Sequence, residues 1–381
     1  MSQTKVPPKV VTQLWVRAGG RCQFRGCNQA LWRDDLTQRE INNAYIAHIV
    51  ADSPDGPRGD VELSPKLAKD FSNLMLLCPT HHNQIDRYVE EYPVELLLQY
   101  KHEHEKRIEQ LTSIDESVKT HLLLFYDNIG NRKPAISIED ARVAVLPRYP
   151  AEASFIEINL SGSPYRDYEP SYFQFRQDEI SRLVERRIRQ RSHSDSINHL
   201  SIFAFASMPL LIHFGYEVGD TIPSDIYQPH RDVSNPWKWR STEDKEFRYL
   251  VDAPEGRDRN IKSIALNLSL SDSIQPEVIS QIMQQPYSTY KLTIPSPNRN
   301  YLQSKEQLEL FKVEMRVLLR QIKEVHGNGH EIHLFPAVPA SIAVSFGQLL
   351  LPKTDPPIHI YEYNHRSNGT RYALTVSEKP A

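Results

Sequence analysis

Three cysteines and a nearby histidine in the first quarter of the chain have the residue types and spacing of metal ligands. Cys22 and Cys27 form a Cys-x4-Cys pair, and Cys78 and His81 form a Cys-x2-His pair. Thiolate and imidazole donors at such spacings are typical of structural zinc sites, so the sequence predicts one Cys3His cluster that holds Zn²⁺. An odd number of cysteines in a long chain does not indicate a disulfide framework, and the alternative is three unrelated buried thiols.

A second set of residues has the chemistry of phosphodiester hydrolysis, which needs a base to activate water and a cation to offset charge on the phosphate. His48 stands in an apolar run and is a candidate base. His82 and Asp86 are four residues apart, so a helix would bring both side chains to one face, where they could bind a catalytic ion such as Mg²⁺.

The elements that must position these residues follow in a simple order. The sequence predicts a helix over 9–19, a strand over 45–50, a loop rich in turn residues over 51–60, and a short helix over 63–70. A strand over 73–77 is expected to turn into a helix after Cys78. A long helix over 94–111 completes the first domain.

Three short motifs in this region resemble the HNH endonuclease family. The resemblance implies a ββα-metal domain in which His48 is the general base, the Asn73 amide orients it, and His82 binds the catalytic ion. Asp86 is then a plausible second ligand. The motifs are Ala47-His48-Ile49, Ser72-Asn73-Leu74 and Leu77-Cys78-Pro79-Thr80-His81-His82.

The sequence departs from the HNH pattern at two positions. Family members often carry an acidic metal ligand just before the base, where this chain has Ala47, and that makes Asp86, Asp52 or Asp60 more important. Many members also have a fourth cysteine at the position of His81. The alternative for this domain is a structural zinc module that binds DNA without cutting it.

Length and composition predict a two-domain protein of the cytoplasm. The chain has 381 residues and a formal net charge of -3, so any nucleic-acid contact must use a local basic patch. No apolar run is long enough for a membrane span, and the first residues have no apolar signal core. We expect an HNH domain over 1–111, a helical connector over 112–134 and a second domain over 135–381.

The second domain has an α/β pattern with an internal repeat. Residues 200–215 align with residues 332–347, and each copy is followed by a second strand-like run, which predicts two Rossmann-like halves. The expected strands are 155–160, 200–205, 261–270, 290–294, 331–335 and 358–363. The expected helices are 173–190, 209–218, 277–284, 305–325 and 340–351.

This half resembles the SAVED domain, a fusion of two CARF-like halves, in the stretches 199–211, 225–231, 237–239 and 333–340. The expected fold is therefore an α+β zinc-stapled ββα-metal (HNH) domain followed by an α/β SAVED domain of two fused Rossmann-like (CARF-like) halves. The whole chain resembles the HNH–SAVED effector endonucleases of bacterial cyclic-oligonucleotide antiphage signalling (CBASS). The resemblance implies a cyclic di- or trinucleotide activator, a homo-oligomer on activation, and degradation of double-stranded DNA with little sequence specificity.

Candidate ligand contacts lie near the carboxyl ends of the expected strands, where Rossmann-like sheets bind ligands. Aromatic rings could stack on bases, cationic side chains could pair with phosphates, and small residues allow close backbone approach. The candidates are Tyr165, Arg166, Ser207, Met208, Trp237, Lys238, Trp239, Arg299 and Pro336. No dinucleotide fingerprint, P-loop or hydrolase triad is present, which indicates binding rather than chemistry. The alternative is a modification-dependent HNH restriction endonuclease whose second half reads altered DNA.

Overall fold

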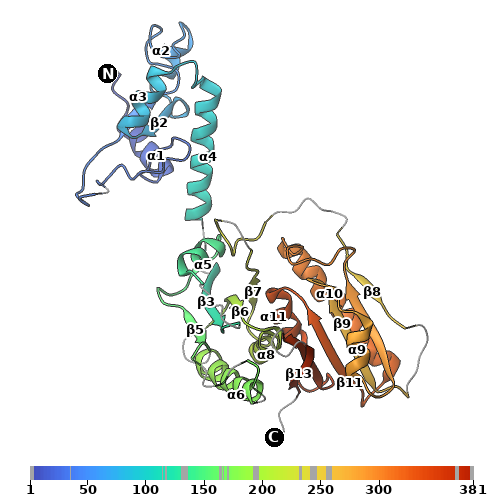
Figure 1. Cartoon of the computed structure of the whole chain (residues 1–381). Helices are drawn as coiled ribbons and strands as arrows, with labels where there is room; N and C mark the ends of the chain where they lie inside the picture. The colour runs from blue at the N-terminus through green and yellow to red at the C-terminus, as the bar shows by residue number, and fades with distance from the viewer. Residues whose placement is uncertain are drawn as a thin grey trace. The chain divides into compact units, whose positions relative to one another are not determined.

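The structure is a computed structural model whose chain divides into two compact units, Met1–Glu116 and Ser117–Ala381. Figure 1 colours the first unit blue to cyan and the second green to red. The structure describes residues 4–34, 36–113, 115, 118–129, 136–162, 165, 167–169, 171–191, 197–230, 234–240, 247–254, 260–364 and 369–377.

The first unit is organised around a two-stranded antiparallel sheet in which His48 lies opposite Leu74. All four residues of the second strand are buried, and the next helix follows it directly, with a proline at its first position. The first helix ends at Gly19, which takes the left-handed conformation at φ 60°. The elements are α1 (Pro8–Ala18), β1 (Tyr45–His48), α2 (Leu63–Leu67), η1 (Phe71–Asn73), β2 (Leu74–Leu77), α3 (Pro79–Arg87) and α4 (Val94–Thr112).

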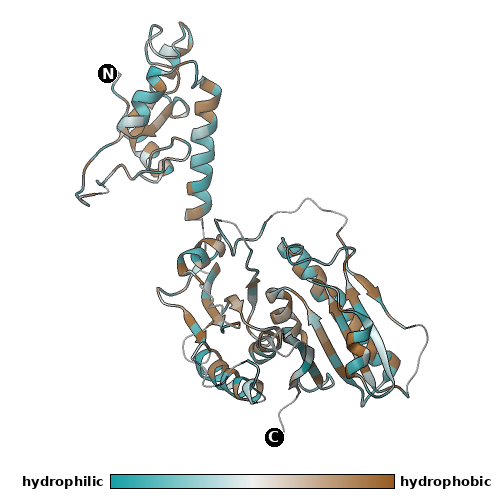
Figure 2. Cartoon of the chain, viewed as in Figure 1, coloured by the Kyte–Doolittle hydropathy of each residue, from teal (hydrophilic) through white to brown (hydrophobic). Residues whose placement is uncertain are grey.

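Helix α4 closes the first unit by packing against α1. Figure 2 shows apolar residues toward both ends of α4 and polar residues along its middle. Its one fully buried apolar side chain is Leu97, and the buried Lys101 and Glu105 pair with each other one turn further on.

The second unit begins with a five-stranded sheet in which every strand pair is parallel. The strand order is β4-β3-β6-β7, and β5 also pairs with β3. The strands are β3 (Lys119–Tyr126), β4 (Tyr149–Pro150), β5 (Ile156–Asn159), β6 (Leu200–Phe205) and β7 (Ser224–Tyr227). The helices are α5 (Ile138–Ala144), α6 (Tyr172–Val184), the π-helix η3 (Glu185–Arg189) and α8 (Met208–Val218).

A six-stranded sheet forms the other half of this unit, in the order β13-β12-β11-β9-β10-β8. Its four middle strands are parallel, and the two edge strands, β8 and β13, are antiparallel to their neighbours. The strands are β8 (Leu250–Asp252), β9 (Ser263–Ser269), β10 (Tyr287–Thr293), β11 (Glu331–Ala337), β12 (Ile358–Asn364) and β13 (Gly369–Val376). The helices are α9 (Pro276–Ile282), α10 (Lys305–His326) and α11 (Ala340–Leu349).

The internal repeat of the sequence corresponds to β6–α8 and β11–α11, and the two helices meet backbone to backbone. A Cβ atom added to Gly215 would lie 2.1 Å from the Val344 carbonyl oxygen. A Cβ added to Gly347 would lie 2.0 Å from the Ile212 carbonyl oxygen. The two glycines are equivalent positions of the repeat, so the halves are joined where neither copy carries a side chain. Figure 1 shows α8 and α11 between the two sheets.

One prediction of secondary structure is wrong. Residues 119–126 lie within the predicted helical connector, but they form β3, which pairs with β4, β5 and β6. The run Leu122–Phe125 is buried because strands of a parallel sheet are covered on both faces, and such a run shows no alternation that would mark a strand. The predicted boundary at 130–134 lies outside the described residues.

Within the described ranges, no helix is both long enough and apolar enough to span a membrane.

Candidate functional site

The first candidate centre is the Cys3His cluster of the N-terminal unit. Its donor atoms all lie within 4.8 Å of one another, and they belong to Cys22, Cys27, Cys78 and His81. The Nδ1 atom of His81 is 3.1 Å from the Cys78 Sγ atom and 3.8 Å from the Cys22 Sγ atom. Tetrahedral ligands about 2.0–2.3 Å from an ion are separated by about 3.3–3.8 Å, so this donor set fits zinc.

Local backbone geometry brings the two cysteine-bearing segments together. Gly26 takes a φ of 84°, which lets the chain turn between Cys22 and Cys27. The Gln23 amide donates to the Leu76 carbonyl at 2.9 Å, and the Leu76 amide donates to the Gln23 side-chain oxygen at 2.7 Å. The first cysteine pair is therefore fixed to β2, the strand that ends at the second pair.

The protonation of these groups is consistent with an ion at this site. Burial raises the pKa of the Cys22 and Cys27 thiols, so both are neutral in the metal-free chain. Burial also lowers the pKa of His81, which keeps its imidazole neutral, as a metal ligand must be. Ion binding would therefore release protons from the cysteines but not from the histidine.

His48 ends β1 with one ring nitrogen already bonded. Its Nε2 atom lies 2.9 Å from the Ala68 carbonyl oxygen. A carbonyl oxygen can only accept, so in the neutral ring Nε2 carries the proton and Nδ1 keeps its lone pair. The ring is thus held in the tautomer that leaves Nδ1 basic.

Asn73 fixes the backbone directly after His48. Its side-chain oxygen accepts from the Val50 amide and its side-chain nitrogen donates to the Val50 carbonyl, each at 2.8 Å. The Ile49 amide donates to the Asn73 carbonyl at 2.8 Å. The amide group therefore lies where the sequence predicts it, and its catalytic role stays a prediction.

His82 and Asp86 lie on one face of α3. The His82 Nε2 atom is 3.8 Å from the Asp86 Oδ2 atom, a separation that two ligands of one ion can have. The His82 ring also packs on Tyr45 of β1, with 4.9 Å between ring centroids. Ala47, on the same face of β1 as Tyr45, is buried. The Ala47 side chain therefore offers no donor atom to an ion near His82.

Asp52 and Asp60 do not extend the His82–Asp86 pair into a larger set of metal ligands. Asp60 accepts from the backbone amides of Glu62 and Leu63 at the start of α2, which occupies one of its oxygens. Among the described residues, the only group of three or more close donor side chains of the metal-binding types is the Cys3His cluster. Neither Asp52 nor Asp60 therefore belongs to a second cluster of that size.

Arg58 also belongs to this site, although no motif in the sequence marks it. Its side chain is 4% exposed and donates to the Ile49 carbonyl at 2.7 Å, to the Ile85 carbonyl at 2.6 Å and to Asp86 Oδ1 at 3.1 Å. Burial lowers its pKa, and the Asp86 carboxylate acts in the opposite direction. Arg58 thus connects the end of β1 to the end of α3 and leaves Asp86 Oδ2 directed toward His82.

The second candidate site is the carboxyl edge of the five-stranded sheet. Asn128, Ser207 and His230 follow three adjacent strands, β3, β6 and β7. Each has a buried side-chain atom without a hydrogen-bond partner in the part of the chain that the structure describes: Asn128 Oδ1, Ser207 Oγ and His230 Nε2. Burial, and to a smaller extent Arg240, lower the pKa of His230 to about 4. Buried polar atoms rarely lack partners, so this edge is suited to a polar ligand.

The start of α11 reaches the same edge from the other half. The Ser341 amide and hydroxyl donate to the side-chain oxygen of Gln228 at 3.2 and 2.8 Å. Gln228 directly follows β7. The site is therefore built from both halves of the second unit.

The predicted ligand contacts fall into different environments. Ser207 is at the edge, and Met208 begins α8 and packs partly on the core. Trp237 is 4% exposed and packs edge-on against Phe203, so it is a core residue and does not present its ring to a ligand. Trp239 is half-buried and its ring lies edge-on to His230, with 5.9 Å between centroids.

The remaining candidates do not gather in one place. Tyr165 is 38% exposed and its ring contacts Phe175, whereas Pro336 is a half-buried residue of β11. Lys238 and Arg299 are exposed, and Arg166 lies outside the described residues. Asn128 and His230 were missed, and their position one to three residues past a strand is the signal that could have identified them.

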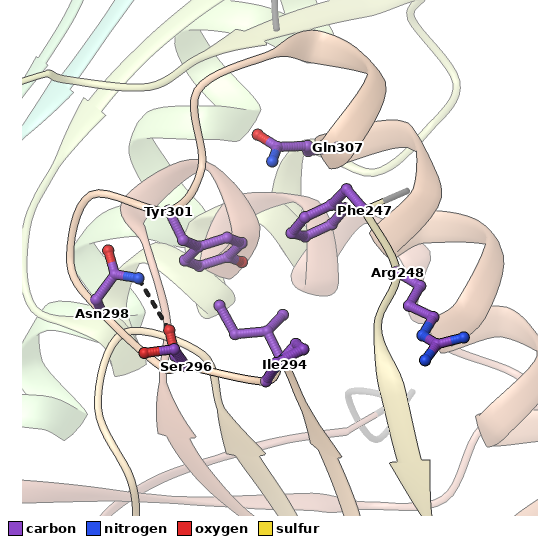
Figure 3. A pocket seen from close by; sticks show the side chains of 8 residues that line it. Phe247, Arg248, Ile294, Ser296, Asn298, Tyr301 and Gln307 are labelled. Atoms are coloured by element: carbon purple, nitrogen blue, oxygen red, sulfur yellow. Dashed lines mark hydrogen bonds between the residues drawn. The ribbon is translucent and has the colours of Figure 1, made fainter. Parts of the chain in front are cut away.

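A separate hollow of about 870 Å³ opens at the carboxyl end of β10. Figure 3 shows Phe247, Ile294 and Tyr301 turned toward one another across it, while Arg248 points away. The rings of Phe247 and Tyr301 are parallel, with 6.1 Å between centroids. The other lining residues are Pro295, Ser296, Asn298 and Gln307.

Two fused α/β halves with an open composite edge define a ligand-binding domain of the Rossmann-like class. The sequence matches the model of SAVED, the "SMODS-associated and fused to various effectors sensor domain", over residues 180–377. The chain belongs to the SAVED family. No curated protein shows a significant match to the chain.

Several solved structures are similar to the chain. One is an Acinetobacter baumannii Cap4 SAVED/CARF-domain containing receptor with the cyclic trinucleotide 3'3'3'-cAAA, with 14% identity and a TM-score of 0.45. That alignment covers 77% of this chain and 62% of the receptor chain. Another is the Moraxella osloensis Cap4 receptor, with 11% identity, a TM-score of 0.43, and coverage of 78% and 60%. This chain thus spans less than two thirds of the receptors it matches.

Proposed function

We propose that the protein is a metal-dependent DNA endonuclease of the HNH type whose activity is switched on by a cyclic oligonucleotide bound to its SAVED domain. The observation that carries the nuclease part is the fixed tautomer of His48. The Ala68 carbonyl holds Nε2 as a donor, and the two bonds from Asn73 to Val50 fix the strand end that carries the ring.

This geometry supports a general-base role for His48. A water molecule that attacks phosphorus must lose a proton as the new P–O bond forms and the ester P–O bond breaks. Nδ1 of His48 can take that proton, because a histidine side chain is the group that most often serves as a general base. The Nε2–H bond to Ala68 then stabilises the imidazolium that results.

His82 and Asp86 would hold the divalent ion, which supplies positive charge opposite the phosphate. Two protein donors are few, but Mg²⁺ commonly keeps several water ligands and is bound through one or two carboxylates. Arg58 would position Asp86 while remaining too buried to contact DNA itself.

The SAVED domain is the proposed sensor. Its family is described as a sensor fused to various effectors, and at the composite edge Asn128, Ser207 and His230 have polar atoms without a partner among the described residues. A cyclic di- or trinucleotide has phosphates and base edges that could satisfy such atoms. Binding would change self-association and bring nuclease domains together on duplex DNA.

The nuclease assignment is tested by DNA cleavage with His48→Ala and Asn73→Ala in the presence of Mg²⁺ and cyclic oligonucleotides. We expect His48→Ala to lower the rate by at least about 10²-fold, the usual contribution of a general base. The zinc content of each variant is the control for folding. Unchanged cleavage by the folded His48→Ala protein would refute the base assignment, and absence of cleavage by the wild type with every activator and ion would favour a non-catalytic zinc module.

A further inference from the structure

The positive charge of the first unit is concentrated before β1. Residues 4–45 contain seven Lys and Arg against three Asp and Glu, a net charge of +4, although the whole chain carries -3. Residues 46–113 contain seven Lys and Arg against twelve Asp and Glu, a net charge of -5. Arg17 and Arg25 pair with Glu105 and Glu103 of α4, so the excess positive charge that can attract a polyanion rests on the other basic residues of this segment.

Part of this basic segment forms a hairpin-like projection. Arg33 and Glu40 pair as an antiparallel bridge, and the Ile41 amide donates to the Trp32 carbonyl at 3.0 Å. The turn is held by Asp34, whose carboxylate accepts from the Thr37 amide and hydroxyl at 2.7 and 2.8 Å. These bonds give the projection a defined shape at its base and at its turn.

Two tryptophans line a shallow slot at the base of this projection. The slot has a volume of about 460 Å³ and is lined by Trp15, Trp32, Glu40, Ile41 and Asn42. Trp32 is 45% exposed, and the Arg33 guanidinium lies 5.0 Å from the centroid of its ring. The Arg33 guanidinium thus places a positive charge beside an exposed aromatic ring.

Gly20 leaves this slot open. Its φ of 64° is left-handed, and a Cβ added there would lie 3.1 Å from Trp32 Cδ1 and 3.7 Å from Trp15 Cζ3. Any side chain at this position would occupy the space between the two rings. The chain thus keeps a gap between two aromatic side chains, one of which lies beside the Arg33 guanidinium.

We propose that this slot binds an unpaired nucleobase of the DNA strand, which stacks on Trp32 while the neighbouring Arg33 guanidinium pairs with a phosphate. The inference rests on the proposed nuclease function. Aromatic rings combined with cationic side chains are the usual means of binding single-stranded nucleic acid without sequence preference. Glu40 and Asn42 add polar groups that can face the edge of a base.

The position of the slot along the chain agrees with this role. Asn42 is three residues before Tyr45, whose ring contacts His82, and six residues before His48. Six extended residues span roughly 20 Å, or about six base-pair steps at 3.4 Å each. A strand whose phosphate lies at His48 can therefore reach the slot with a base only a few nucleotides away.

Binding to DNA by the full chain carrying His48→Ala tests the slot without cleavage. The probe is a duplex with a short single-stranded overhang that contains 2-aminopurine, whose fluorescence is quenched by stacking. In this background Trp32→Leu keeps an apolar side chain but removes the ring, and we expect about tenfold weaker binding and unquenched 2-aminopurine. Trp32→Phe keeps a ring and should retain most of both signals. Leu98→Ala, which alters a side chain of similar exposure (42%) on α4, should change neither.

If Trp32→Leu and its parent bind DNA with equal affinity and quench 2-aminopurine equally, the proposal that a base binds in the slot is wrong. The nuclease proposal would be unaffected. If the parent binds DNA neither alone nor with any of the synthetic cyclic di- and trinucleotides, the proposed function fails and the slot fails with it. A change in oligomeric state in Trp32→Leu, with DNA affinity unaltered, would assign the slot to a protein partner and also overturn the inference. The zinc content of each variant reports whether the unit is folded.

Discussion

The two units of the protein differ in what holds them together. Among the described residues, the apolar core of the first unit contains thirteen buried residues, and two of them are the cluster cysteines Cys22 and Cys78. The main core of the second unit contains forty-nine buried residues, drawn from both sheets and the helices between them. The first unit is thus too small to rely on apolar burial alone, whereas the second is not.

The two units also differ in the chemical groups that their candidate sites contain. The first unit has four of its candidate ligands on one short strand-to-helix turn, where Cys78 and His81 join the cluster with Cys22 and Cys27, and His82 and Asp86 form another pair. The second unit has no comparable group of donors among its described residues and instead has unpartnered polar atoms at a sheet edge. The first arrangement is suited to metal-dependent chemistry, and the second to recognition.

The largest expected effect is the loss of the zinc cluster. Cys78→Ser should abolish zinc binding and unfold the first unit, because structural zinc contributes on the order of 10 kcal/mol and more to small folds. The second unit should remain folded. Limited proteolysis with mass spectrometry and metal analysis would show cleavage confined to residues 4–113. A protease-resistant first unit without zinc would contradict the role of the cluster.

The next largest effect is expected from a substitution at the contact between α8 and α11. Gly347→Ala places a Cβ atom 2.0 Å from a backbone oxygen that cannot move without shifting α8, so we expect a loss of about 3 kcal/mol or more in the stability of the second unit. Gly162→Ala is the matched control, because an added Cβ there meets no atom within 4 Å. Scanning calorimetry of the full chain should show a lower transition for the first variant only. Equal transitions would mean that the helices do not meet at these glycines.

Arg58 tests how the two parts of the predicted active site are connected. Arg58→Lys keeps the charge but cannot make all three bonds, so strand and helix should separate more easily, by about 1–3 kcal/mol. Hydrogen exchange at the Ile49 and Val50 amides should accelerate about tenfold. Arg25→Lys is the control, since the pair of Arg25 with Glu103 is exposed and contributes little. Similar exchange in both variants would show that Arg58 does not position this site.

The smallest effect concerns the sensor edge and pH. The folded-state pKa of His230 is about 4, below the unfolded value of 6.5, so the unfolded chain binds the proton more readily. The neutral ring therefore costs the folded state nothing above pH 6.5, and the second unit loses stability as the pH falls from 6.5 toward 4. The calorimetric midpoint of the second unit should therefore fall more steeply over this range in the wild type than in His230→Gln. Parallel pH profiles would contradict the burial of a neutral ring.

The sequence predicted most of the elements and the donor sets, because both depend on local spacing. The candidate zinc ligands fall into two closely spaced pairs, Cys22 with Cys27 and Cys78 with His81, and the repeat of 200–215 in 332–347 shows directly in residue order. Strand β6 has the predicted bounds of Leu200–Phe205. The α/β character of the second unit and its SAVED assignment are confirmed by the family match.

What the sequence could not predict depends on contacts distant along the chain. Strand β3 has an unbroken apolar run that looks the same in a buried helix and in a central parallel strand. Trp237 is predicted to stack on a ligand, but it is buried against Phe203. The residues next to it in the sequence do not indicate this burial. Arg58 lies in a polar loop. Only the fold shows that its side chain is buried between the end of β1 and the end of α3.

The central claim is that the second unit controls a nuclease in the first. The most direct measurement is the cleavage of unmodified plasmid DNA by the purified full chain with Mg²⁺, with and without synthetic cyclic di- and trinucleotides, beginning with 3'3'3'-cAAA. We predict cleavage that requires one of these activators and is absent from His48→Ala. Cleavage that is independent of every cyclic nucleotide but requires modified DNA would contradict the account and assign the second unit to reading the substrate.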